Sequence, residues 1–286
     1  MSNETTSPES GTELSAADQR RLVRERYGDI AANSTSCGDD TDETSGCCDT
    51  DRETAEFDDQ SHLKGYSEDE ITDVAPGANL GLGCGNPTAI ASLRDGETVL
   101  DLGSGAGFDC FLAAREVGSD GRVIGVDMTP EMIERARENV DKNDADNVAF
   151  RLGEIEHLPV ADGTVDVIIS NCVVNLSPDK PQVFGEAFRA LRPGGRIAIS
   201  DVVLTAELPA EVRGDPESLS ACVAGASRID DLESILREAG FVDVSITPKE
   251  DSEEFIREWD DNRDLSEYLV SASIEGRKPK SEYSNR

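Results

Sequence analysis

The chain has 286 residues, which suits one well-filled α/β domain with additions, or a domain plus a small second lobe. Its 60 acidic residues outnumber its 27 basic residues, giving a formal net charge of −33. A surface this negative repels phosphate backbones and anionic lipid, so we expect no nucleic acid and no membrane among its partners. The acids are spread along the chain, which is typical of an acidic proteome in a salt-rich cytoplasm.

The distribution of apolar residues also bears on the location of the protein. No stretch approaches the ~20 apolar residues of a membrane span, and the start, MSNETTSPES, lacks the basic residues and apolar run of a secretory signal. We therefore expect a cytoplasmic protein. In that compartment the seven cysteines favour metal, metalloid or redox roles over a structural disulfide framework.

The N-terminal part differs in composition from the rest. Residues 15–32 predict a short amphipathic helix, with apolar side chains recurring among charges. Residues 33–61 are rich in Asp, Thr, Ser and Gly with few apolar residues, which predicts a mobile acidic loop. We therefore divide the chain into residues 1–63, a helix with a flexible cysteine-containing segment, and residues 64–286, the main domain with an insertion at about 204–228.

The main domain alternates short apolar runs with helical patterns. Nearly continuous apolar strands between helices predict a parallel sheet that is covered on both faces. Val242–Thr247 and Tyr268–Glu275 follow the last helix and predict an antiparallel pair at one edge, which makes a seven-stranded sheet in all. The predicted parallel strands are Thr98–Leu102, Arg122–Val126, Val148–Leu152, Val165–Ser170 and Arg196–Val203, and the helices are Phe108–Val117, Pro130–Lys142, Lys180–Leu191 and Asp230–Ala239.

A glycine-rich turn follows the first of these strands. Asp101 ends the strand, and Gly103-Ser104-Gly105-Ala106-Gly107 leads directly into a helix. Such a turn lets a ligand approach the backbone closely beside a helix N-terminus. Dinucleotide enzymes also use glycine-rich turns, although the spacing here is Gly-x-Gly-x-Gly and not Gly-x-Gly-x-x-Gly.

Further candidates for ligand contacts follow the next two strands. Asp127 ends the second strand, where an acid can accept both hydroxyls of a ribose, as it also does in NAD enzymes. Glu154 and Ile155 follow the third strand and are placed to meet the edge and face of an adenine. The candidate cofactor contacts are Asp101, Gly103, Ser104, Gly105, Gly107, Asp127, Met128, Glu154, Ile155 and Asn171.

Together with the Arg-x-Leu-Arg-Pro-Gly-Gly-Arg turn that ends at Arg196, these motifs resemble, in order and spacing, the series of class I S-adenosylmethionine methyltransferases. The resemblance implies a Rossmann-like α/β fold and S-adenosyl-L-methionine as cofactor. It also implies that residues 64–286 are a methyltransferase domain, and that the insertion at about 204–228 helps to build the acceptor site.

Three of the four cysteines in this domain lie where an acceptor site is expected. Cys172 follows the fourth strand, Cys84 lies in a Gly-rich loop before the domain's first strand, and Cys222 lies in the insertion. Taken singly, each of the three is as compatible with a buried structural residue as with a functional one. Cys110 lies in a core-facing helical pattern and is best interpreted as a buried structural residue. Convergence of the other three would form a site for a soft, thiophilic centre.

These cysteine motifs resemble those of bacterial and archaeal arsenite methyltransferases. The matching stretches include Asn79-Leu-Gly-Leu-Gly-Cys-Gly-Asn-Pro87 and Ser170-Asn-Cys-Val-Val-Asn-Leu176. The resemblance implies that Cys172 and Cys222 bind As(III), and that Cys84 completes the site and pairs with an N-terminal cysteine during turnover. The N-terminal partner is one of Cys37, Cys47 and Cys48; we take Cys37 as the candidate, while Cys47-Cys48 is equally compatible with simple scavenging of a soft metal.

The resemblance also implies the partners of the reaction. Arsenite or its thiol complex is the expected substrate, and a low-molecular-weight thiol or thioredoxin-like protein is the expected reductant and co-substrate. Two alternatives stay open. One is a methyltransferase of a small metabolite such as a quinone, and the other is an arsenic- or soft-metal-binding protein without turnover.

Overall fold

The computed structural model describes residues 14–33, 50–209, 212, 222–260 and 263–280. The expected N-terminal partner cysteines, Cys37, Cys47 and Cys48, therefore lie outside the described residues, as does most of the insertion expected at about 204–228.

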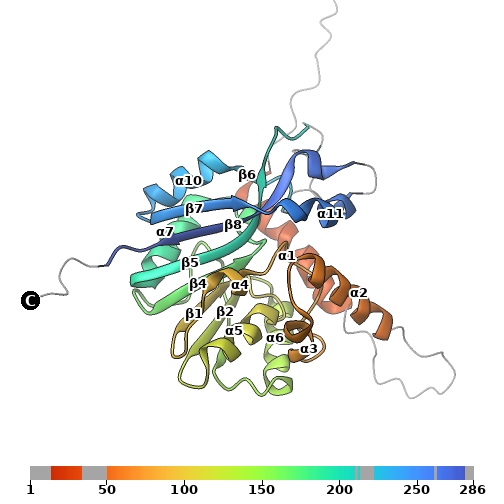
Figure 1. Cartoon of the computed structure of the whole chain (residues 1–286), viewed down its shortest axis with the longest axis vertical. Coiled ribbons are helices and arrows are strands. Elements are labelled where there is room, and N and C mark those ends of the chain that lie inside the picture. Colours follow the sequence, from red (N-terminus) through yellow and green to blue (C-terminus); the bar gives the residue numbers. More distant parts are fainter. Residues whose placement is uncertain (1–13, 34–49, 210–211, 213–221, 261–262, 281–286) are drawn as a thin grey trace, which may run out of the picture.

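One mixed sheet organises the chain, in the order β3-β2-β1-β4-β5-β8-β7 (Figure 1). The first five strands pair in parallel, whereas β8 is antiparallel to both β5 and β7. The predicted parallel sheet with an antiparallel edge hairpin is thus confirmed. The sheet gains an eighth strand, because the two residues of β6, Ser227–Arg228, pair with β5. The other strands are β1 Thr98–Leu102, β2 Arg122–Asp127, β3 Val148–Leu152, β4 Val165–Asn171, β5 Leu191–Leu204, β7 Val242–Pro248 and β8 Leu269–Arg277.

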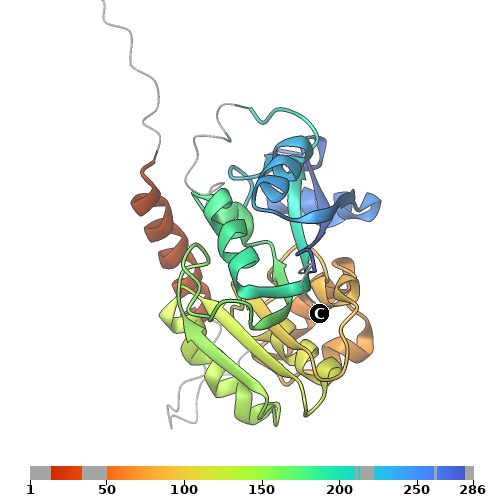
Figure 2. The ribbon, with the colours of Figure 1, turned by 90° about the vertical axis from the view of Figure 1, so that its left-hand side faces the viewer.

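Helices cover both faces of the sheet, as the continuous apolar strands require (Figures 1 and 2). Along β1, Val99 packs with the core under α5 and α6, while Leu100 and Leu102 pack with the core under α7 and α10. The long helices are α5 Phe108–Val117, α6 Pro130–Lys142, α7 Lys180–Ala190 and α10 Ile229–Glu238, and the short ones are α3 Glu68–Asp73, α4 Pro87–Ala91, α11 Glu253–Ile256 and the 3-10 turns Val174–Leu176, Glu250–Ser252, Arg257–Trp259 and Leu265–Glu267.

Two further helices precede the sheet. The predicted N-terminal helix is confirmed as α1, Ala16–Asn33, which lies against α6, where Arg135 Nη1 donates to the Ala31 carbonyl oxygen at 3.0 Å. The expected loop over residues 33–61 is wrong in its second half, because α2 spans Thr50–Leu63. Contacts distant in sequence stabilise this helix: Asn79 Nδ2 donates to Asp58 Oδ1 at 3.3 Å and to Ser61 Oγ at 3.0 Å.

In the part of the chain that the structure describes, no helix has the length and apolar character needed to span a membrane.

Candidate active site

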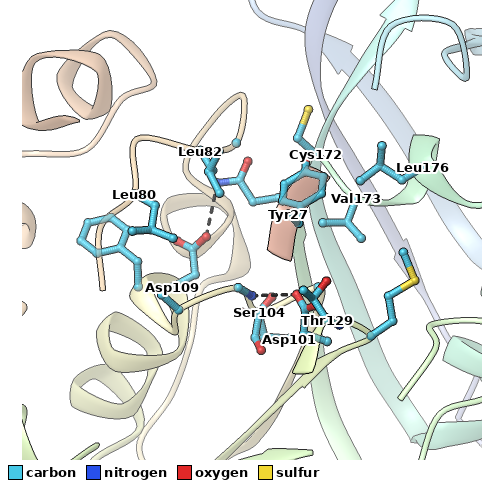
Figure 3. A pocket seen from close by; sticks show the side chains of 18 of the residues that line it. Tyr27, Leu80, Leu82, Asp101, Ser104, Asp109, Thr129, Cys172, Val173 and Leu176 are labelled. Atoms are coloured by element: carbon cyan, nitrogen blue, oxygen red, sulfur yellow. Dashed lines mark hydrogen bonds between the residues drawn. The ribbon is translucent and has the colours of Figure 1, made fainter. Parts of the chain in front are cut away.

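A cavity opens at the carboxyl ends of the central strands, where doubly wound sheets bind their ligands (Figure 3). Its walls are the turn after β1, the ends of β2 and β4, the segment around Leu80 and Leu82, and side chains of α1. Most of the residues predicted to contact a cofactor line this cavity: Asp101, Gly103, Ser104, Gly105, Asp127, Met128, Ile155 and Asn171.

The glycine turn after β1 needs its glycines. Gly103, Gly105 and Gly107 have φ of 71°, 51° and 100°, which side chains rarely adopt. A Cβ on Gly103 would stand 2.4 Å from Cγ2 of Val173, so the turn and the segment after β4 touch here.

Ser104 Oγ is buried and lines the cavity without a hydrogen-bond partner among the described residues. An unpaired buried hydroxyl costs free energy, which a polar ligand in the cavity would recover.

Asp127 is held so that part of its carboxylate remains free. Its Oδ2 accepts from the Gly105 amide at 3.0 Å, and its Oδ1 accepts from the Thr129 amide at 2.8 Å. Burial raises the pKa of Asp127, and the backbone hydrogen bonds oppose that effect. Each carboxylate oxygen keeps a lone pair, so the group can accept two hydroxyls of a ribose. Together with the unpaired Ser104 hydroxyl, this arrangement fits the nucleoside part of S-adenosylmethionine.

Two further buried carboxylates line the cavity. Asp101 Oδ2 accepts from the Cys110 thiol at 3.2 Å, and Asp109 Oδ1 accepts from the Tyr66 hydroxyl at 2.7 Å. Burial raises the pKa of Asp101 and that of Asp109, the latter to about 6, and the charge of Asp109 raises the pKa of Asp101 further. Two acids that repel each other in a buried cavity favour a cationic ligand.

Sequence reasoning missed Asp109 and Tyr66. The available signal for Asp109 was a charged residue in the otherwise apolar first turn of α5, Phe108-Asp-Cys-Phe111. No comparable signal existed for Tyr66, which reaches the cavity from the segment between α2 and α3. Cys110 lies in the hydrophobic core, as its pattern predicted.

The loop after β3 is placed differently from the prediction. Ile155 lines the cavity, but Glu154 does not; it faces α1, 3.6 Å from Arg20 Nε and 3.6 Å from Arg24 Nη2. Glu156 lines the cavity instead, and accepts from Arg20 Nη2 at 3.1 Å and from Ser177 Oγ at 2.8 Å. The remaining predicted contact, Gly107, begins α5 and is not part of the lining.

The three candidate cysteines meet next to this cavity. Cys84, Cys172 and Cys222 belong to one apolar cluster, and all three are buried. Cys222 Sγ donates to the Cys172 carbonyl oxygen at 2.6 Å, and Cys172 lines the cavity. Contact with the thiols of Cys222 and Cys84 raises the pKa of Cys172 well above its ordinary value, and burial raises it further. The prediction that three separate segments bring these cysteines together agrees with this geometry.

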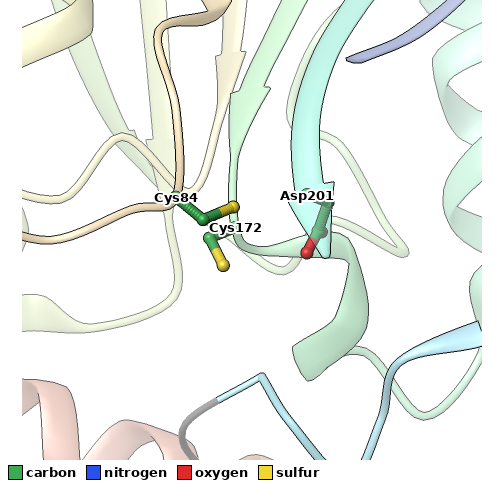
Figure 4. Close-up of side chains that lie close together, drawn as sticks. All are labelled: Cys84, Cys172 and Asp201. Carbon is green, nitrogen blue, oxygen red and sulfur yellow. The ribbon is translucent and has the colours of Figure 1, made fainter. Parts of the chain in front are cut away.

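A carboxylate that the sequence did not suggest joins them. The sulfurs of Cys84 and Cys172 and a carboxylate oxygen of Asp201 all lie within 4.8 Å of one another (Figure 4). Asp201 stands near the carboxyl end of the long strand β5 and is 1% exposed. An acid inside an apolar strand was the signal that could have indicated it.

The backbone at two of the cysteines is strained. Cys172 and Cys222 have φ of 58° and 67°, and left-handed backbone costs a residue other than glycine roughly 1–3 kcal/mol. Neighbouring contacts hold Cys172 in this conformation, because its amide donates to the Ser200 carbonyl oxygen at 2.8 Å. Strain of this kind persists where the surrounding structure fixes the direction of a side chain.

Asn171 connects the cysteines with the cavity. Its Oδ1 accepts from the Cys84 amide at 2.9 Å, and its Nδ2 donates to the Gly85 carbonyl oxygen at 2.7 Å and to the Tyr66 hydroxyl at 3.0 Å. Gly83 leaves room for this side chain, since a Cβ there would lie 2.5 Å from it. The amide therefore fixes the Cys84 loop against the strand end that carries Cys172.

Comparison with known proteins gives a consistent result. Residues 93–240 match the family model described as a methyltransferase domain. The chain is 62% identical over 266 residues to an arsenite methyltransferase of Halobacterium salinarum, covering 92% of this chain and 67% of that protein. It is 39% identical over 229 residues to an arsenite methyltransferase of Aquipseudomonas alcaligenes, covering 77% of this chain and 61% of that protein.

A solved structure is similar as well. The crystal structure of an arsenic(III) S-adenosylmethionine methyltransferase from Chlamydomonas reinhardtii matches with a TM-score of 0.58 at 36% identity, covering 77% of this chain and 73% of that one. Fold and cavity together define an S-adenosylmethionine-dependent methyltransferase. Within that class the chain belongs to the arsenite methyltransferase family, although it spans only about two-thirds of the length of these two curated relatives.

Proposed function

We propose that the protein transfers the methyl group of S-adenosylmethionine to As(III) held by Cys84, Cys172 and Cys222, as an arsenic detoxification reaction. One observation carries this proposal: cysteines from three distant segments are buried together beside the cavity, and Cys172 belongs to both. Thiols in this number suit a thiophilic acceptor.

The residues of the cavity would bind and orient the cofactor. Asp127 would accept the ribose hydroxyls, Ile155 would pack on the adenine, and Ser104 would pair its free hydroxyl. When bound, S-adenosylmethionine supplies an electrophilic methyl group on a positively charged sulfonium sulfur. Asp101 and Asp109, buried in the cavity wall, would compensate that positive charge.

The cysteines would exchange with the oxygen ligands of arsenite. Three thiols replace three hydroxyls and release three waters, leaving a pyramidal As(III) with an exposed lone pair. That lone pair would form the new bond to the methyl carbon while the bond from this carbon to the sulfonium sulfur breaks, and S-adenosylhomocysteine would leave with that electron pair. Catalysis would therefore rest mainly on proximity and alignment and need no general base. Transfer raises arsenic formally to As(V).

A cysteine pair would then return two electrons to arsenic and form a disulfide, Cys84 with an N-terminal cysteine, for which Cys37 is the candidate. A low-molecular-weight thiol or a thioredoxin-like protein would reduce that disulfide by thiol exchange. This cycle suits the cytoplasm, where thiols are kept reduced.

Methyl transfer from labelled S-adenosylmethionine to arsenite, with thiol and high salt, tests the proposal. We expect methylated arsenic from the native chain and none from Cys172→Ser, which should still bind S-adenosylmethionine. Cys110→Ser is the matched control, since it lies outside the thiol cluster and its hydroxyl can still donate to Asp101. Retained transfer in Cys172→Ser would contradict the proposal, and cofactor binding without any arsenic product would favour a small-metabolite acceptor.

A further inference from the structure

The cysteine cluster contains a second kind of ligand set. Cys84, Cys172 and Asp201 offer two sulfurs and one oxygen, all within 4.8 Å of one another and all buried (Figure 4). We propose that this Cys-Cys-Asp group binds a zinc-class divalent cation, and that the bound cation prevents arsenite from entering. The zinc site itself does not depend on the proposed arsenic chemistry; only the competition does.

The dimensions suit tetrahedral zinc. With bonds of about 2.3 Å to sulfur and about 2.0 Å to oxygen, neighbouring ligand atoms around tetrahedral zinc lie about 3.5–3.8 Å apart. The three atoms already lie within 4.8 Å of one another, so side-chain rotations that move the ligand atoms by about 1 Å would bring them to tetrahedral spacing. Cys222 or a water would occupy the fourth position.

The oxygen ligand separates zinc from arsenic. Zinc accepts mixed sulfur and carboxylate ligands, whereas As(III) is held by sulfur. Asp201 is oriented for such a role: its Oδ1 accepts from Asn175 Nδ2 and from the Val202 amide, both at 2.8 Å. Its Oδ2 accepts from the Asn175 amide at 3.3 Å. Hydrogen bonds that orient a ligating carboxylate are a regular part of metal sites.

Charges around the group support binding of the deprotonated ligands. Two thiolates and a carboxylate carry three negative charges, of which a divalent cation cancels two. Three partly or fully buried lysines interact electrostatically with these ligands: Lys64 with Cys84 and Cys172, Lys249 with Cys84, and Lys180 with Asp201. Cys172 also lines the cavity, which provides a route of entry from solvent.

Zinc and arsenite cannot be bound together if both use Cys84 and Cys172. Removing the carboxylate should therefore affect the two ligands unequally. In Asp201→Asn we expect zinc affinity to fall at least tenfold and arsenite affinity to change less than about threefold, whereas Cys172→Ser should lose both. The matched control is Asp166→Asn, another buried acid, which accepts from the Thr98 amide at the opposite end of the sheet.

The experiment measures Zn²⁺ binding to the reduced full-length chain by competition with a chromogenic chelator. Cys37, Cys47 and Cys48 are replaced by serine in every sample, so that N-terminal thiols cannot bind the metal. A tenfold loss in Asp201→Asn with no loss in Asp166→Asn supports the proposal. Equal zinc affinity in Asp201→Asn and the parent overturns it.

Two further measurements apply if Asp201→Asn does not fold. Zinc X-ray absorption of the parent complex should show at least two sulfurs together with oxygen, and a shell made of sulfur alone overturns the Asp201 ligand. A loss of bound arsenite in proportion to the zinc bound supports mutual exclusion of the two ligands. If zinc binds through Asp201 and arsenite binding does not change, the zinc site is supported and the competition is wrong. The proposed function is tested separately by arsenite binding to Cys172→Ser, which should be lost.

Discussion

The cofactor half of the site is built mainly from the backbone and end residues of consecutive strands, whereas the cysteine half is built from side chains of three distant segments. The turn after β1 and the end of β2 are joined directly, since the Gly105 amide donates to Asp127. Cys84, Cys172 and Cys222 meet only because the loop before β1, the end of β4 and the insertion fold together. Cofactor binding should therefore be most sensitive to changes in the backbone, and arsenic binding to the loss of single thiols.

The largest expected effect is in the backbone of the cofactor half. Gly103→Ala places a Cβ 2.4 Å from Val173 at a φ of 71°, so the turn must shift. We expect S-adenosylmethionine affinity to fall more than about a hundredfold and the free energy of unfolding to fall by roughly 2–4 kcal/mol. Calorimetry and thermal melting measure the two quantities.

Gly163→Ala is the control for that experiment. Gly163 also has a positive φ, of 63°, but a Cβ there meets no atom within 4 Å. We expect about 1 kcal/mol of destabilisation and unchanged cofactor affinity. Equal losses of affinity in the two variants would contradict the specific role of the contact between the turn and Val173.

A pH dependence is the next largest effect. Burial raises the pKa of Asp109 to about 6, and its charged form is the one that favours a cation. Affinity for S-adenosylmethionine should therefore be full above about pH 6 and fall up to ~tenfold per unit as pH falls through that value. Asp109→Asn should bind more weakly at pH 7.5 and lose the step near pH 6. A step of the same size in Asp109→Asn would assign the titration to another group.

The smallest expected effect concerns the N-terminal helix. Arg20 reaches from α1 to Glu156 in the cavity wall, with Nη2 3.1 Å from Oε1. Arg20→Ala leaves that buried acid with fewer partners, and we expect about fivefold weaker cofactor binding, corresponding to about 1 kcal/mol. Arg21→Ala, which removes exposed ion pairs on the same helix, should change binding by less than twofold. Similar losses in both would indicate that α1 acts only through its overall charge.

The same contrast explains how far the sequence could predict the molecule. The strands, the main helices and the turn around Gly103 follow from local patterns, since an apolar run, a strand-end acid and closely spaced glycines lie within a few residues of one another. The position of Cys172 beside the ligand site also followed, because the carboxyl ends of strands in a parallel sheet share one edge, and the Gly-rich loop around Cys84 was expected to cover that edge.

Other features required the tertiary structure. Asp201 lies within a buried strand and comes close to Cys172 through the pairing of β4 with β5 in the sheet. Glu156 lies in the cavity wall and Glu154 outside it, because the loop after β3 has no regular period that assigns one side to each residue. The helix α2 has a polar sequence and depends on contacts with Asn79, more than fifteen residues away.

The central claim is that arsenic held by these thiols receives the methyl group. The direct measurement is a single turnover: reduced protein is loaded with arsenite, unbound arsenite is removed, and labelled S-adenosylmethionine is added. We expect about one labelled methylarsenic species per protein chain, and none when Cys172 is replaced by serine. Equal labelling of arsenic by Cys172→Ser, or label transferred to another acceptor with arsenic left unmethylated, would contradict it.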